Sequence, residues 1–150
     1  NKRLASDYIE GLNILSSMRM CANVPCQSAI QTALGGYQSI DDLVKENGRL
    51  RIQRDVTTDM LNGIDGISCV KPKGAMYCFA KVDEKKFNIQ NDEKMVLDLL
   101  SSEKILLVHG RAFNLTEGTY FRLVFLPHSD VLVPALHRIG NFFRTYKQGA

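Results

Sequence analysis

The stretch Leu106–Leu126, LLVHGRAFNLTEGTYFRLVFL, consists of two apolar runs joined by a polar connection that contains two glycines. Each run is short and apolar, and the second is rich in aromatic and β-branched residues, so each predicts a β-strand. Arg122 lies in the middle of the second run. A guanidinium keeps its charge in a protein, and burying it therefore requires a partner with matching acceptors.

The alternation along the second run places Arg122 on one face of the predicted sheet. Successive side chains of a strand point to opposite faces, so Phe121 and Leu123 share the other face, which we expect to pack against helices. Arg122 could pair with an internal Asp or Glu, or reach solvent along its aliphatic stem. It could also bind a ligand, for which a carboxylate is the natural choice, because its two oxygens match the planar guanidinium. The pattern alone leaves these explanations open.

The residues before this stretch predict mainly helices. Apolar side chains recur at spacings of three and four from Leu4 to Met20, which indicates an amphipathic helix. Proline, glycine and capping signals predict further helices over residues 25–35, 39–46 and 49–61. In the last of these helices the residues expected to face inward are Leu50, Val56, Met60 and Leu61.

After Gly66 the periodicity changes to that of strands. Residues 67–72, ISCVKP, and residues 74–82, GAMYCFAKV, predict a hairpin. Asp92 is expected to cap a helix over residues 93–103.

A final helix completes the chain in this prediction. Ser129 or Asp130 should cap it, and its inward side should consist of Leu132, Leu136, Ile139 and Phe143. Helices followed by strands mixed with helices predict an α+β fold in two layers. We expect a mixed or antiparallel sheet of roughly three or four strands, covered by helices and preceded by a long helix.

The composition is that of one ordinary globular domain. The chain has 150 residues, of which 45% are hydrophobic and 23% charged, and a net charge of +3. Basic and acidic residues are interspersed, so neither nucleic acid nor an anionic membrane is predicted as a partner. No apolar run approaches the ~20 residues of a membrane-spanning helix, and we expect a cytoplasmic protein.

No metal site or common nucleotide motif is apparent. The three histidines, His109, His128 and His137, lie far apart without the spacing of zinc ligands. The four cysteines form no CxxC pair, and we expect them to be buried as small hydrophobic residues: Cys21, Cys26, Cys69 and Cys78.

Four segments together resemble the C-terminal part of the class I/II aminotransferases, and more narrowly their bacterial alanine (glutamate–pyruvate) branch. The segments are YIEGLNILSSMRMCANVPCQSAIQTALGGYQSI (residues 8–40), DGISCVKPKGAMYCFAKVD (65–83), KKFNIQNDEKMVLDLLSSEKILLVHGRAFN (85–114) and TYFRLVFLPHSDVLVPALHRIGNFF (119–143).

This resemblance implies a fold-type I enzyme that uses pyridoxal 5'-phosphate and works as a homodimer with active sites at the subunit interface. Its substrates would be amino acids and 2-oxo acids, with an amino group passing between alanine or glutamate and pyruvate or 2-oxoglutarate. Residues 1–24 would be the helix and link from a large domain, and residues 25–150 would be the small C-terminal domain.

The resemblance also implies roles for three residues. Arg122 matches the strand arginine that binds the substrate α-carboxylate. Gly110, in VHGRAF, matches a glycine that lets its loop approach the substrate cleft. Arg19 lies one position from where aspartate-type members carry an arginine that contacts a side-chain carboxylate in the neighbouring subunit's site. The alternative for Arg19 is a solvent-facing arginine near a helix end.

The catalytic groups of the family are expected outside this chain. The lysine that bonds the cofactor and the phosphate-binding loop lie upstream in the family, and no lysine here stands in that context. We therefore expect no catalytic or cofactor-binding residue in the chain, which should be inactive alone. Two alternatives remain: a free-standing α+β module that binds a carboxylate or a protein, and an aminotransferase with another donor, such as aspartate or an aromatic amino acid.

Overall fold

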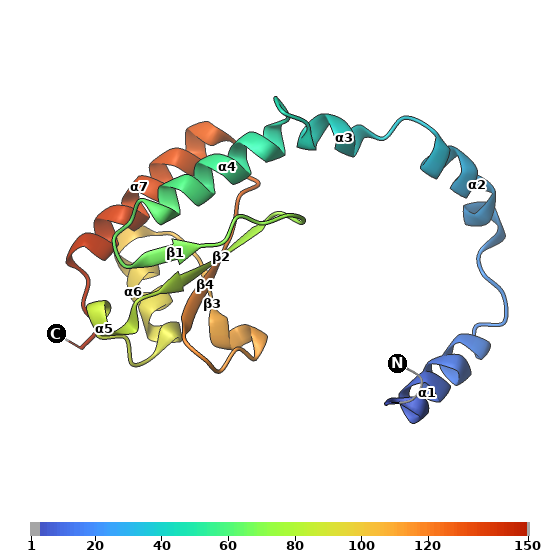
Figure 1. Ribbon diagram of the computed structural model, residues 1–150, viewed down its shortest axis with the longest axis horizontal. Helices are drawn as coiled ribbons and strands as arrows, with labels where there is room; N and C mark the ends of the chain where they lie inside the picture. Colours follow the sequence, from blue (N-terminus) through green and yellow to red (C-terminus); the bar gives the residue numbers. More distant parts are fainter. Residues whose placement is uncertain (1–3, 150) are drawn as a thin grey trace. The chain divides into compact units, whose positions relative to one another are not determined.

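A computed structural model describes residues 4–149 of the chain, which divides into two units, Asn1–Ser39 and Ile40–Ala150. The first unit contains α1 (Ser6–Ser17) and α2 (Val24–Gly35), as the sequence predicts (Figure 1). The side chain of Asn23 caps α2 by accepting a hydrogen bond from the Cys26 N–H at 3.1 Å. None of the described residues of this unit is buried.

The second unit is built on an antiparallel sheet of four strands in the order β1-β2-β4-β3 (Figure 1). The central strands, β2 (Tyr77–Val82) and β4 (Thr119–Val124), have six residues each. The edge strands are shorter, with three residues in β1 (Ile67–Cys69) and two in β3 (Val108–His109). The predicted antiparallel sheet of three or four strands is therefore confirmed.

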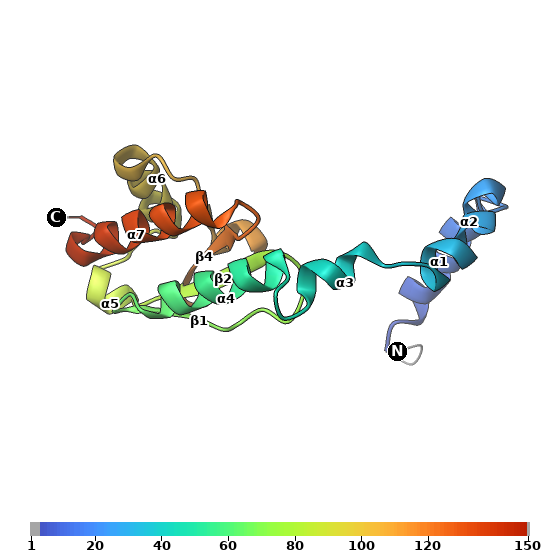
Figure 2. The ribbon, with the colours of Figure 1, turned by 90° about the horizontal axis from the view of Figure 1, so that it is seen from above.

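Three helices cover one face of the sheet: α4 (Arg49–Asn62), α6 (Asp92–Glu103) and α7 (Ser129–Thr145). Helices α4 and α7 lie side by side in both views of the ribbon (Figures 1 and 2). This arrangement confirms the predicted α+β fold. Shorter turns of helix are α3 (Ser39–Val44), α5 (Glu84–Phe87) and the 3₁₀ turn η1 (Gly110–Phe113), of which the sequence predicted only α3.

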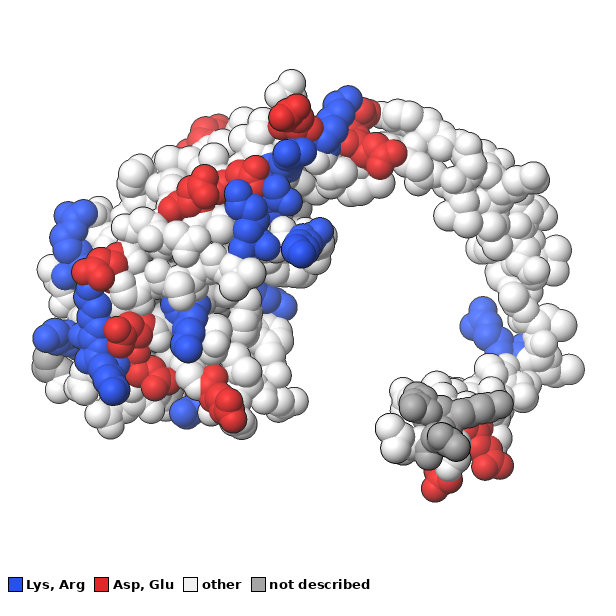
Figure 3. Space-filling view, in the orientation of Figure 1, with Lys and Arg blue, Asp and Glu red and all other residues white. Residues whose placement is uncertain are grey.

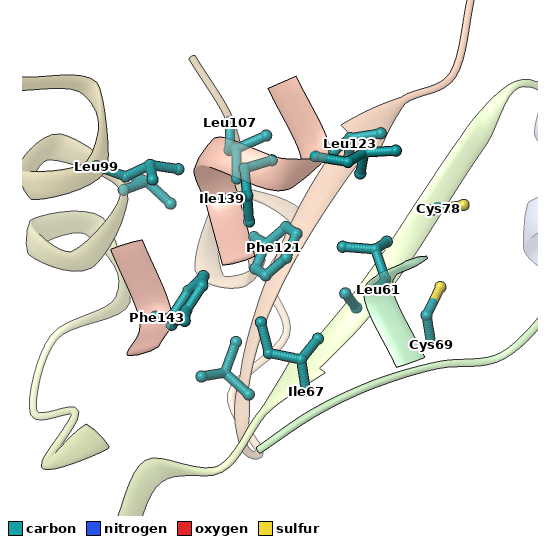
Figure 4. Close-up of a cluster of buried hydrophobic side chains, with 14 of the residues drawn as sticks. Leu61, Ile67, Cys69, Cys78, Leu99, Leu107, Phe121, Leu123, Ile139 and Phe143 are labelled. Carbon is teal, nitrogen blue, oxygen red and sulfur yellow. The ribbon is translucent and has the colours of Figure 1, made fainter. Parts of the chain in front are cut away.

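The core lies between the sheet and these helices. Phe121 is fully buried, and its ring stacks against that of Phe143 on α7 with centroids 6.1 Å apart (Figure 4). Burying a large apolar side chain contributes about 1.5–3 kcal/mol, so the sheet face and the inward side of α7 dominate the stability of the unit. That side of α7 consists of the four residues predicted: Leu132, Leu136, Ile139 and Phe143.

The inward face of α4 differs from the prediction. Its buried residues are Gln53, Thr57, Thr58 and Leu61, and the partly buried Met60 packs against the core. Of the four predicted inward residues, Met60 and Leu61 are therefore confirmed. The Gln53 amide donates to the backbone carbonyls of Leu126, at 3.4 Å, and of Pro127. Because these hydrogen bonds offset the cost of burying a polar side chain, an inward position that hydropathy assigns to apolar residues holds glutamine here.

Two predicted helix caps are wrong. Asn91, not Asp92, caps α6, because its side chain accepts from the Lys94 N–H at 2.9 Å. Asp92 is instead the first residue of the helix. At α7 the N-cap is His128, and neither Ser129 nor Asp130 occupies that position.

The cysteines fall into two groups. Cys69 and Cys78 are buried in the core, as predicted (Figure 4), whereas Cys21 and Cys26 are exposed in the first unit, contrary to the prediction. A hydrogen bond between the buried thiols lowers the pKa of Cys69 to about 7 and raises the pKa of Cys78.

Charged residues of both signs are interspersed on the face of the second unit shown in Figure 3. This mixture agrees with the absence of a basic stripe in the sequence. Among the described helices, none has the length and apolar character needed to span a membrane.

Candidate functional site

Arg122 occupies the middle of β4, opposite Phe79 of β2 and Val108 of β3. Its neighbours Phe121 and Leu123 are buried on the helix side of the sheet, while Arg122 itself is half-buried. Arg122 therefore lies on the sheet face opposite the core, as the alternation in the sequence predicts.

Two aromatic rings contact the guanidinium of Arg122. Its central carbon lies 4.6 Å from the ring centroid of Tyr77 and 4.5 Å from that of Phe113. These separations are typical of cation–π contacts, in which a ring face attracts the positive charge. We refer to Tyr77 and Phe113 as the aromatic pair.

Further rings extend the aromatic pair along the sheet face. Phe79 meets Phe113 edge to face with centroids 5.8 Å apart, and stacks on Tyr120 at 5.3 Å. Tyr77, Phe79 and Phe113 all keep more than a third of their surface exposed. Arg122 is thus set in an open aromatic surface rather than in a closed core.

No acidic side chain compensates this charge among residues 4–149, because none of the ion pairs there includes Arg122. Its Nε atom is buried and has no hydrogen-bond partner within the same residues. The internal ion pair considered from the sequence is therefore not formed there. A buried donor without an acceptor costs about 1–3 kcal/mol, and a carboxylate is an acceptor whose two oxygens match the planar guanidinium.

Gly110 brings η1 close to β4. A Cβ atom at this position would lie 3.1 Å from Cβ of Tyr120 and 3.3 Å from its carbonyl oxygen. Only a residue without a side chain fits this approach without displacing the turn. Since η1 also carries Phe113, the predicted site residues Gly110 and Arg122 belong to one local arrangement.

Asp92 contacts η1, although nothing in the sequence pattern indicates this contact. Asp92 is 3% exposed, and its Oδ2 accepts a hydrogen bond from the backbone N–H of Arg111 in η1 at 3.0 Å. Its Oδ1 lies 3.7 Å from Nε of Arg111. An acidic residue at a helix start ordinarily indicates an exposed position at the helix dipole, and no local signal reveals a contact to a turn 19 residues away.

Arg19 lies in the turn that follows α1 and is exposed. Its backbone N–H donates to the carbonyl of Ser16 at 3.2 Å. Arg19 belongs to the first unit, and its contact with a side-chain carboxylate in a neighbouring subunit's site stays a prediction.

The surface around Arg122 does not by itself fit pyridoxal phosphate. That cofactor needs a lysine amine to bond its aldehyde and several donors around its phosphate. The lysine on this surface is Lys81, which is exposed and lies 5.9 Å over the ring of Tyr120. Among residues 4–149, the aromatic side chains that surround Arg122 supply no group of donors for a phosphate. Nor do three His, Cys, Asp or Glu side chains gather as metal ligands in the part of the chain that the structure describes.

Comparison with known proteins gives a family. Residues 5–139 match the family described as aminotransferase class I and II. The chain is 56% identical over 147 residues to a glutamate-pyruvate aminotransferase AlaA of Haemophilus influenzae, covering 98% of this chain and 36% of that protein. It is 52% identical to an alanine aminotransferase of Mycobacterium tuberculosis, covering 98% of this chain and 34% of that enzyme.

Solved structures agree with these sequence matches. An aminotransferase from Escherichia coli superposes with a TM-score of 0.81 at 53% identity, over 99% of this chain and 37% of that chain. An alanine aminotransferase from Pyrococcus furiosus gives a TM-score of 0.73 at 34% identity, over 93% of this chain and 34% of that chain. The chain thus spans about a third of the length of these relatives. By sequence and by structure, this chain belongs to the aminotransferase class I and II family.

Proposed function

We propose that this chain is the C-terminal, carboxylate-binding part of a pyridoxal-phosphate aminotransferase. The enzyme transfers an amino group between alanine or glutamate and a 2-oxo acid, pyruvate or 2-oxoglutarate. The names and identities of the relatives support this substrate choice, since those matching over 98% of the chain are glutamate-pyruvate or alanine aminotransferases. The division into residues 1–24 and 25–150, the homodimer and the cytoplasmic location stay predictions.

The observation that carries the proposal is the state of Arg122. Its charge lies on an open aromatic surface, and its Nε atom has no hydrogen-bond partner among residues 4–149. In the proposed enzyme the α-carboxylate of the substrate accepts from this guanidinium through both oxygens. Amino acids and 2-oxo acids both carry this carboxylate, so one arginine serves both directions of the reaction.

The role of Arg122 is to bind and orient. The cofactor supplies the chemistry that withdraws electrons from the substrate, and residues outside this chain hold it. Fixing the carboxylate sets the direction of the bonds at the neighbouring carbon, which is a positional contribution to the rate. Gly110 assists by allowing η1 to approach β4. Arg19 is retained as a weaker candidate for contact with a side-chain carboxylate.

Replacing Arg122 tests the proposal in the longer enzyme that carries this chain. Arg122→Lys keeps the charge and removes the planar geometry, and we expect kcat/KM for alanine and for pyruvate to fall at least tenfold, ~1.4 kcal/mol. The matched control is Arg138→Lys, since Arg138 lies on α7 and pairs with Glu103 at 3.2 Å. A fall of less than tenfold in the Arg122 variant, or an equal fall in the control, would refute the assignment.

The isolated chain should not retain the cofactor. Four of the described lysines form ion pairs with acidic side chains: Lys45, Lys71, Lys86 and Lys94. After incubation with pyridoxal phosphate and dialysis, we expect no visible absorbance band and no transamination. A yellow colour that survives dialysis would contradict the proposal that the cofactor-bonding lysine lies outside this chain.

A further inference from the structure

We infer that Asp92 and Phe113 are positioning residues for Arg122. In this inference Asp92 holds the turn η1, and η1 holds the ring of Phe113 against the guanidinium. The inference rests on the proposed function, because an orientation of Arg122 matters only if Arg122 binds the substrate carboxylate.

The first step is the attachment of η1 to α6. Asp92 is almost fully buried, which is costly for a carboxylate unless it is paired and hydrogen-bonded. Both of its oxygens are directed at Arg111: Oδ2 accepts from the backbone N–H at 3.0 Å, and Oδ1 lies 3.7 Å from Nε. Within residues 4–149, Oδ1 has no hydrogen-bond partner. The side-chain contacts of the buried Asp92 carboxylate are therefore directed at Arg111, which belongs to η1.

The second step is the position of Phe113 at the end of the same turn. Gly110 fixes the start of η1 against Tyr120, and Asp92 holds Arg111. The turn ends at Asn114, whose φ of 57° terminates the 3₁₀ conformation. Phe113 is thus placed within two residues of a rigid attachment, and its ring lies 4.5 Å from the guanidinium carbon of Arg122.

The third step is that core packing does not explain the position of Phe113. Phe113 is 43% exposed, and besides the guanidinium of Arg122 its ring contacts the ring of Phe79 in a T-shaped arrangement. A ring against a guanidinium restricts the rotation of the arginine while leaving its N–H groups free. Ordering a binding side chain before the ligand arrives reduces the entropy lost on binding. Phe113 thus prepares Arg122 for a carboxylate.

The test uses the full-length enzyme with three variants. Asp92→Asn removes the buried charge, Phe113→Leu removes the ring, and Phe113→Tyr keeps the ring as a conservative rescue. For Asp92→Asn and Phe113→Leu we expect KM for alanine and for pyruvate to rise by about five- to tenfold, the range that one cation–π contact can supply. The value of kcat should change by less than about twofold, because the bound substrate still meets the same reacting groups.

A carboxylate that cannot react separates binding from chemistry. The inhibition constant for propionate should rise by the same factor as KM in the first two variants, and Phe113→Tyr should restore it. The matched controls are Asp98→Asn and Phe142→Leu. Asp98 lies on the same helix as Asp92 but accepts a hydrogen bond from Tyr146, and the ring of Phe142 stacks on that of Tyr146. We expect the two controls to alter thermal stability without altering KM or propionate binding.

The outcomes separate this inference from the proposed function. If Arg122→Lys weakens propionate binding while Asp92→Asn and Phe113→Leu leave it unchanged, the inference fails and the proposed function stands. If Arg122→Lys leaves propionate binding unchanged, the proposed function fails. When Arg122→Lys is already present, Phe113→Leu should weaken propionate binding little further. If the two substitutions weaken propionate binding by fully additive amounts, Phe113 does not act through Arg122. If Asp92→Asn does not fold, the two variants of the half-exposed Phe113, Phe113→Leu and Phe113→Tyr, decide whether the inference holds.

Discussion

Arg122 shows how a charge can be held in place without being neutralised. The aromatic pair attracts the guanidinium through ring faces, and these contacts consume none of its five N–H donors. An internal carboxylate would have stabilised the charge more strongly but would have occupied the same donors. The residue is therefore restrained in orientation and still able to bind an anion.

At the scale of single residues, a further prediction concerns Gly110. A Cβ here would press on Tyr120 at 3.1 Å, so Gly110→Ala should shift η1 and lower the free energy of unfolding by about 1–3 kcal/mol, as overpacking typically does. Urea denaturation followed by circular dichroism measures this loss. Gly74→Ala is the control, because nothing lies within 4 Å of its added Cβ, and an equal loss in both variants would contradict the argument.

At the scale of elements, the sequence predicted the features that depend on hydrophobic periodicity. The inward side of α7 was predicted correctly because its apolar side chains recur at the helical period. The two faces of β4 were predicted correctly because successive side chains of a strand point to opposite faces. The inward position of Gln53 on α4 could not be predicted, since Gln53 is buried through hydrogen bonds to residues more than 70 positions away.

The residues of the candidate site also differ in whether the sequence predicts them. Arg122 stands out in the sequence because a charge interrupts an apolar run, and its face can be deduced from strand alternation. The burial of Asp92 depends on the turn that it contacts, and the contact of Phe113 with Arg122 depends on the path of η1 over β4. Neither contact follows from the spacing of residues in the sequence, so the roles of Asp92 and Phe113 could be identified only from the structure.

A prediction at this scale concerns the contact between α6 and the C-terminal end of α7. The hydroxyl of Tyr146 donates to Oδ2 of Asp98 at 2.8 Å. Burial, and then this hydrogen bond, raise the pKa of Tyr146 to about 12 from its ordinary 10. Because the pKa is raised in the folded state, the stabilisation is fully present below pH 10 and is lost as the pH rises through about 12.

Tyr146→Phe should remove this part of the pH dependence. The free energy of unfolding of the unchanged chain should fall more steeply between pH 10 and 12 than that of the variant, measured by urea denaturation at several pH values. The exposed Tyr37 provides the control variant, Tyr37→Phe. Parallel pH profiles for the unchanged chain and Tyr146→Phe would show that the contact to Asp98 does not stabilise the fold.

At the scale of the whole molecule, the described surface carries more apolar side chains than a self-sufficient domain needs. In the first unit the exposed large hydrophobic residues include Leu12, Leu15, Met18, Ile30 and Leu34, and in the second the aromatic surface around Arg122 is open. Large exposed apolar surface is typical of interfaces with other protein. It agrees with a chain that spans about a third of its relatives' length.

The isolated chain should therefore self-associate. Static light scattering over a range of concentrations should show a mass that rises above the 16.8 kDa of the monomer. In the proposed full-length enzyme we expect these surfaces to be covered, and the mass should be independent of concentration at that of one defined oligomer. A strictly monomeric chain at high concentration would contradict this expectation.

The shortness of the two outer strands limits the form that such association can take. With three residues in β1 and two in β3, the sheet offers few unpaired backbone groups for another strand to join. Stacking of strands into a cross-β fibril requires longer free edges. Contacts between isolated chains must then form through side-chain faces, and the resulting assemblies should dissolve on dilution and bind no amyloid dye.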